Sequence, residues 1–129
     1  AVYFSAGPSP GLPQATAGVS DIAPIGEPLA KVYFSVDQAV FVDENNLVVL
    51  RTKQVLATQP AGIILLSGFH DASGDPKHNA QLAMARAVAV RDVLVAGGVP
   101  VVRVKFRRPE STVGSGGPEE ARRVEIRVQ

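Results

Sequence analysis

The stretch that decides the fold is residues 68–87, which read GFHDASGDPKHNAQLAMARA. It begins as the end of an apolar strand, continues as a short polar loop and then becomes a helix. Asp75 suits the capping position of that helix, and Pro76 suits its first turn because the N–H that proline lacks would have no partner there. We therefore expect a strand, a loop and a helix that starts near Pro76.

One charged residue falls on the helix face that should be buried. At about 100° per residue, Arg86 lies about 40° from Leu82, close to the centre of the apolar stripe. The stripe consists of Leu82, Ala85, Ala89 and Val93. A buried guanidinium is costly unless an anion and hydrogen bonds satisfy it, and Asp71 is the nearest candidate carboxylate. The pattern fits a pocket of opposite charges, an internal ion pair, or an arginine whose stem reaches out to water.

Length and composition limit the class of protein. The chain has 129 residues, 46% of them apolar and 19% charged, with a formal net charge of +1. These values fit one folded domain plus a tail, and they do not by themselves indicate a polyanionic partner. The absence of cysteine excludes disulfides and thiolate chemistry. No apolar run is long enough to span a membrane, so membrane association would require an anchor outside this sequence.

Residues 1–29 differ in composition from the rest of the chain. They are rich in proline, glycine, alanine and serine, and we expect a partly extended linker or N-terminal extension followed by a domain over residues 30–129. Residues 2–5 and residues 32–35 share the sequence Val-Tyr-Phe-Ser. This repeat is either a coincidence or an additional strand at a sheet edge, in the same chain or in a neighbouring one.

The remaining patterns predict an α/β (α+β sandwich) fold. Strands are expected over residues 31–35, 63–66, 102–107 and 124–128, and helices over residues 43–58 and 76–96. The order β-α-β-α-β-β favours a mixed four-stranded sheet with both main helices on one face. The apolar residues of the first helix cover a wide arc, so we expect that helix to be well buried. Residues 108–119 are expected to be a loop.

Several motifs in order resemble the OmpA-like C-terminal domain, a peptidoglycan-binding module of bacterial envelope proteins. The resemblance covers residues 30–129 and includes the tracts 32–37, 68–90, 94–103 and 122–126. It implies the fold just described and a non-catalytic role, without a cofactor or metal. It also implies the periplasm of a Gram-negative bacterium, with an anchor in the inner or outer membrane that tethers the protein to the cell wall.

The resemblance also implies the ligand and its site. Such domains bind diaminopimelate, or an equivalent free amino-acid end, on the peptide stem of peptidoglycan. Carried onto this chain, Asp71 would accept hydrogen bonds from the ammonium and Arg86 would hold the carboxylate. The other ligand-binding positions that the motif implies are Asn79, His70 and Gly74.

Other functions are also compatible with parts of the sequence. Phe69, Ala83 and Ala121 differ from the residues usual in the family, so an alternative is an OmpA-like fold used for protein association or homodimerisation. A metal site could be assembled from His70, Asp71, Asp75 and His78, although no dense ligand motif is present. The arginines of the last strands could bind nucleic acid, but few aromatic residues accompany them. The sequence contains no Ser-His-Asp signature that would indicate catalysis.

Overall fold

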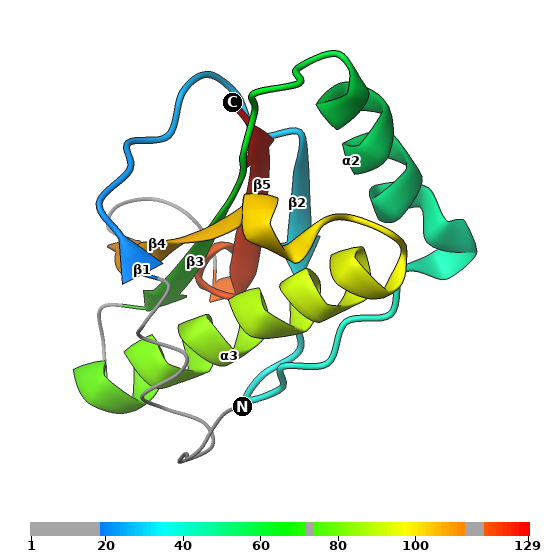
Figure 1. Ribbon diagram of the computed structural model, residues 1–129. Coiled ribbons are helices and arrows are strands. Elements are labelled where there is room, and N and C mark those ends of the chain that lie inside the picture. Colours follow the sequence, from blue (N-terminus) through cyan, green and yellow to red (C-terminus); the bar gives the residue numbers. More distant parts are fainter. Residues whose placement is uncertain (1–18, 72–73, 113–117) are drawn as a thin grey trace, which may run out of the picture.

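The computed structural model describes residues 19–71, 74–112 and 118–129, which form a mixed five-stranded sheet covered by two helices (Figure 1). The elements in chain order are β1 (Val19–Ser20), β2 (Ala30–Tyr33), the short helix η1 (Glu44–Asn46), α2 (Leu47–Ala57), β3 (Ile64–Asp71), α3 (Pro76–Ala96), η2 (Val101–Arg103), β4 (Val104–Thr112), η3 (Pro118–Ala121) and β5 (Arg123–Val128). The predicted order of two helices and four strands is confirmed, and β1 is an additional strand that the sequence did not predict.

The strands lie in the order β1-β4-β3-β5-β2, so β3 occupies the centre of the sheet. It runs parallel to β4 and antiparallel to β5. One face of the sheet supplies Leu66, Phe106 and Ile126 to a core that also contains Val49 of α2 and Val90 of α3. Both helices therefore pack into the same core, as predicted.

The first described segment is attached to the sheet rather than separate from it. β1 pairs in parallel with β4 at one edge, and β2 pairs with β5 at the other, so residues 21–29 connect the two edges. Three backbone carbonyls of this connection accept hydrogen bonds from side chains. The Ile22 carbonyl accepts from Arg107 of β4, and the carbonyls of Gly26 and Ala23 accept from Arg127 and Gln129 at the C-terminal end. Residues 1–18, with the first Val-Tyr-Phe-Ser copy, lie outside the described residues.

An aspartate carboxylate accepts a hydrogen bond from an N–H group in the first turn of each main helix. The Asp75 carboxylate accepts a hydrogen bond of 3.0 Å from the Lys77 N–H, and Pro76 is the first residue of α3, as predicted. α2 starts at Leu47, later than predicted, and its N-cap is Asn46; the carboxylate of Asp43, which precedes η1, accepts a hydrogen bond of 2.9 Å from the Val48 N–H. In both cases the carboxylate satisfies an N–H group that has no partner inside the helix.

The expectation that the first helix is well buried is wrong. Leu47 and Leu50 are 63% and 50% exposed, and α2 buries only Val49, Thr52 and Leu56. The apolar residues of α2 cover a wide arc, but only the side of the helix toward α3 and the sheet has neighbours to pack against. The pattern of apolar residues indicates how wide the apolar arc is, but it does not indicate which part of the arc contacts the core.

β3 and β4 both continue further than the sequence predicted. β3 extends to Asp71, with a register shift between Ser67 and Phe69, and β4 extends to Thr112, into the stretch expected to be a loop. Gly68 lies at the register shift, where a Cβ atom would approach within 2.7 Å of the Ala83 carbonyl oxygen in α3. The missing side chain therefore lets α3 lie close to the end of β3.

We predict that Gly68→Ala destabilises the domain, because the added methyl group meets helix backbone that cannot rotate away. Urea unfolding should show a loss of about 1–3 kcal/mol, typical of overpacked sites. An unchanged unfolding midpoint would contradict the close helix–strand contact.

The sheet face opposite the helices carries a buried ionic group. Glu125 is 6% exposed, and its two carboxylate oxygens each accept a hydrogen bond of 2.9 Å, one from Arg123 and one from Arg127. Burial raises the pKa of the Glu125 carboxyl, but the hydrogen bonds and charges of the two arginines outweigh it and leave the pKa below its ordinary value. The ionised form of Glu125 thus stabilises the folded domain.

This pKa shift predicts a dependence of stability on pH. Because the pKa of Glu125 is lower in the folded state, its contribution is complete above the ordinary glutamate pKa and is lost as pH falls through the folded-state pKa. Thermal unfolding followed from pH 7 into this acidic range should therefore show that Glu125→Gln removes part of the acid-induced loss of stability. Glu119→Gln, at an exposed position, is the matched control and should leave the slope unchanged. Parallel pH profiles for wild type and Glu125→Gln would contradict the prediction.

Candidate functional site

An open pocket of about 180 Å³ lies where the C-terminal end of β3, the first turns of α3 and residues 34–38, the loop that follows β2, meet. The chain before β5 completes its wall. The lining residues are Val36, Asp37, His70, Asp71, Asn79, Leu82, Arg86, Ala121 and Arg122. Four of the five residues predicted to bind ligand, all except Gly74, line this pocket.

The acidic side of the pocket is built on the end of β3. The Asn79 side-chain amide donates a hydrogen bond of 3.1 Å to the backbone carbonyl of Asp71, and His70 Nδ1 lies 3.1 Å from the same oxygen. Gly74 has a φ of +79°, a conformation that favours glycine, in the chain between Asp71 and α3. Asn79 therefore holds the backbone of Asp71, while Gly74 contributes a turn rather than a wall of the pocket.

The basic side of the pocket contains Arg86, whose residue exposure is only 2%. Its Nε donates a hydrogen bond of 2.8 Å to the Gln38 carbonyl, and its Nη2 donates one of 3.1 Å to the Ser35 carbonyl. The Arg86 Cζ lies 5.5 Å from the centroid of the Phe34 ring. These contacts fix the guanidinium against residues 34–38 without neutralising its charge.

Arg86 has no ion pair with any carboxylate in the part of the chain that the structure describes. Burial lowers the pKa of the Arg86 guanidinium, the nearby charge of Arg122 lowers it further, and the charge of Asp37 raises it. Of the three arrangements that fit the sequence, the internal ion pair and the arginine that reaches out to water are both wrong. What remains is a buried positive charge on the wall of a pocket that also contains carboxylates.

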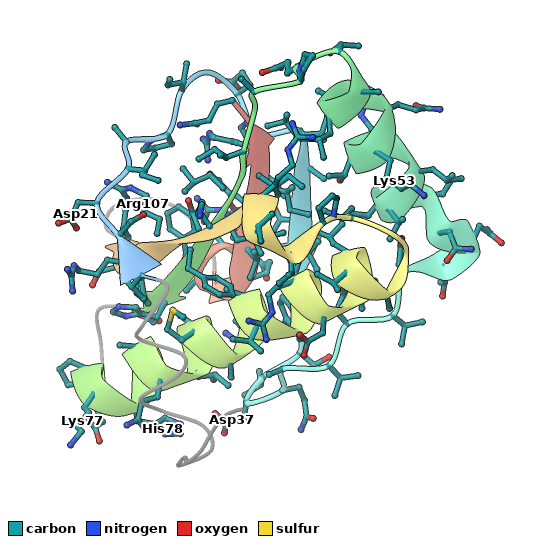
Figure 2. The ribbon with its side chains drawn as sticks, viewed as in Figure 1. Asp21, Asp37, Lys53, Lys77, His78 and Arg107 are labelled. Atoms are coloured by element: carbon teal, nitrogen blue, oxygen red, sulfur yellow. The ribbon has the colours of Figure 1, made fainter. Side chains whose placement is uncertain are left out.

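Two charged residues of the pocket were not among the predicted site residues. Asp37 has a φ of 55°, and its Oδ1 lies 3.7 Å from His78 Nε2 at the start of α3 (Figure 2). Arg122 donates a hydrogen bond of 2.9 Å from Nε to the Phe34 carbonyl. Both belong to tracts that carry the family resemblance, but only the folded chain shows that these tracts meet at the site of Asp71 and Arg86.

The residues considered for a metal site have separate roles. Asp75 caps α3, and His78 lies against Asp37. Among the described residues, no group of three or more histidine, aspartate or glutamate side chains is placed to hold a metal ion.

The basic residues considered for nucleic-acid binding are largely engaged within the domain. Arg103 donates to the carbonyls of Gly62 and Gln59, and Arg107 forms an ion pair with Glu110. Within the described ranges, no helix has both the length and the apolar character needed to cross a bilayer.

Comparison with known proteins identifies the family. The model of the OmpA family matches residues 33–123, well over half of the chain. The structure is similar to that of the peptidoglycan-associated lipoprotein from Burkholderia pseudomallei, with a TM-score of 0.65 and 27% identity over 77% of this chain and 89% of that one. A search of curated proteins gave no match.

Two further structures share the fold at lower identity. The periplasmic domain of Helicobacter pylori MotB has a TM-score of 0.57 and 22% identity, over 76% of this chain and 73% of that one. The cell wall anchor of the T6SS from Pseudomonas aeruginosa has a TM-score of 0.55 and 24% identity, over 74% and 76% of the two chains. The resemblance predicted from the sequence is thereby confirmed, and the chain belongs to the OmpA family.

Proposed function

We propose that this domain binds peptidoglycan without catalysis, through the free amino-acid end of diaminopimelate or an equivalent residue on the peptide stem. The observation that carries the proposal is the buried, positively charged Arg86 on the wall of an open pocket that also contains Asp71. Such a site is complementary to a ligand carbon that bears both a carboxylate and an ammonium.

Each side of the pocket suits one end of such a ligand. The Arg86 guanidinium is a planar donor and can hold a carboxylate through two parallel hydrogen bonds. The Asp71 carboxylate accepts hydrogen bonds from the ammonium, and the contact of Asn79 with the Asp71 backbone supports its position. A ligand carboxylate in direct contact with Arg86 also compensates its buried charge more closely than Asp37, whose charge acts on Arg86 without an ion pair.

The size of the pocket favours the end of a peptide stem over a complete saccharide unit. Its volume of about 180 Å³ is below the roughly 300–1,000 Å³ of sites that enclose drug-sized ligands. The opening leaves the remainder of the stem outside the domain.

The relatives support the same assignment. A peptidoglycan-associated lipoprotein, a periplasmic MotB domain and a cell wall anchor share this fold. We infer that the present domain lies in the periplasm of a Gram-negative bacterium, where it attaches an envelope protein to the cell wall.

A sedimentation assay with purified sacculi tests the proposal. Wild type should sediment with the sacculi, and Asp71→Ala and Arg86→Ala should lose at least tenfold in affinity, about the effect of one charge-assisted hydrogen bond. Asp92→Ala and Arg91→Ala are matched controls, because these residues of α3 form an ion pair with each other and do not line the pocket. Equal sedimentation of all five folded proteins would reject the site.

A competition assay tests which chemical group of the ligand the domain recognises. Free meso-diaminopimelate should release the wild-type domain from sacculi, because it presents a carboxylate and an ammonium on one carbon. Lysine that is amidated at its carboxyl group presents the side-chain ammonium without a neighbouring carboxylate and should be much less effective. Equal release by both compounds would contradict recognition of the carboxylate by Arg86.

A further inference from the structure

The outer side of β2 is an open edge of the sheet. β2 stands at the end of the strand order and pairs with β5 on one side, and none of the other described residues pairs with its outer side. The Phe34 N–H, directly after β2, donates a hydrogen bond of 2.8 Å to the Arg122 carbonyl on the β5 side. Because the backbone groups of successive strand residues point to alternate sides, the N–H and C=O groups of Lys31 and Tyr33 point outward.

The two faces of β2 carry different side chains. Val32 and Phe34 are each 6% exposed and belong to the core, whereas Tyr33 is 46% exposed and lies with Lys31 on the opposite face. A further strand at this edge would therefore need apolar side chains toward the core, and it could carry polar or aromatic side chains on the other face.

The sequence contains a segment with this pattern. Residues 2–5 repeat the Val-Tyr-Phe-Ser sequence that begins in β2, and none of them is proline, so each can donate its N–H. In an antiparallel register, Tyr3 would lie opposite Tyr33 and Ser5 opposite Lys31. Both would be hydrogen-bonded pairs, in which the two residues exchange two N–H···O=C bonds, so this register uses every outward-pointing group of the edge.

The same register also matches the side chains. Val2 would lie opposite Phe34 and Phe4 opposite Val32, so both apolar pairs fall on the core face of the sheet. Cross-strand pairs of an aromatic and a β-branched residue stabilise neighbouring strands. A shift by one residue would instead turn the tyrosine and the serine toward the core, which favours the unshifted register.

We propose that residues 2–5 of the same chain pair with the outer side of β2 as a sixth strand of the sheet. An exposed strand edge is a template for pairing with other chains, and the added strand closes it. Phe34 leads into residues 34–38, which form a wall of the pocket, so the strand also holds the start of that wall. The inference does not depend on which ligand the pocket binds.

The same chain is a better source of this strand than a second copy. β1 and β2 lie at opposite edges of the sheet, about 19 Å apart at the usual strand spacing. Residues 6–18 span up to about 43 Å when fully extended, which is enough to pass around the sheet. The few hydrogen bonds of so short a strand each replace a hydrogen bond with water, so they hold separate molecules together only weakly. A segment tethered by a short connection has an effective concentration in the millimolar range, which favours pairing within one chain.

Hydrogen exchange of individual backbone amides, followed by NMR on the full chain, tests the proposal. The amides of Lys31 and Tyr33 should exchange about tenfold more slowly in wild type than in Tyr3→Pro, which removes an N–H of the added strand. Thr16→Pro introduces a proline outside the pairing segment and should match wild type. The Phe34 amide, which is bonded on the β5 side, should exchange at the same slow rate in all three proteins.

Contacts between protons of the two strands give a second readout. In wild type, nuclear Overhauser effects should connect the Cα protons of Val2 and Phe34, and those of Phe4 and Val32, because non-hydrogen-bonded pairs bring the Cα atoms closest together. These contacts are measured on wild type alone and do not depend on the folding of a variant. Their absence would overturn the proposal.

Two results of the exchange experiment would also overturn the proposal. Equal exchange of the Lys31 and Tyr33 amides in wild type and Tyr3→Pro would mean that residues 2–5 do not protect the edge. Protection of these amides that increases with protein concentration would assign the added strand to a second copy and contradict pairing within one chain.

Discussion

The Arg86 guanidinium, buried against two backbone carbonyls without a carboxylate partner, is the constraint on which the rest of the site depends. Removing a charge from water is expensive, and the carbonyls of Ser35 and Gln38 and the ring of Phe34 compensate only part of that cost. The contacts fix the loop after β2 against α3. They also leave the positive charge on the wall of a pocket, and in the proposed function the carboxylate of the ligand completes the compensation. The proposed binding and the attachment of this loop to α3 therefore use the same side chain.

The positions of the helices could be predicted from the sequence because their signals are local. Asp75 and Pro76 mark the start of α3, and Ala96 is followed by two glycines that end it. The position of Arg86 on the apolar stripe was also visible, because helical periodicity places it without knowledge of the fold. These features explain why the overall order of elements and the place of Arg86 followed from sequence patterns, whereas the family resemblance assigned His70, Asp71 and Asn79 to the pocket.

The other features of the fold and of the pocket could not be predicted, because they depend on contacts between segments that are distant in the sequence. Asp37 and Arg122 reach the pocket from either end of the domain, and no spacing rule connects them to Arg86. The two described residues of β1 become a strand through their pairing with β4. The exposure of Leu47 depends on which side of α2 meets the core. In each case the partner, rather than the local sequence, determines the structure.

The most direct test of the central claim is a crystal structure of the domain with the diaminopimelate tripeptide bound. We predict that the terminal carboxylate of the ligand contacts the Arg86 guanidinium and that its ammonium contacts the Asp71 carboxylate. A ligand bound elsewhere on the domain, or one whose carboxylate does not contact Arg86, would contradict the claim that this buried charge is the anion-binding group.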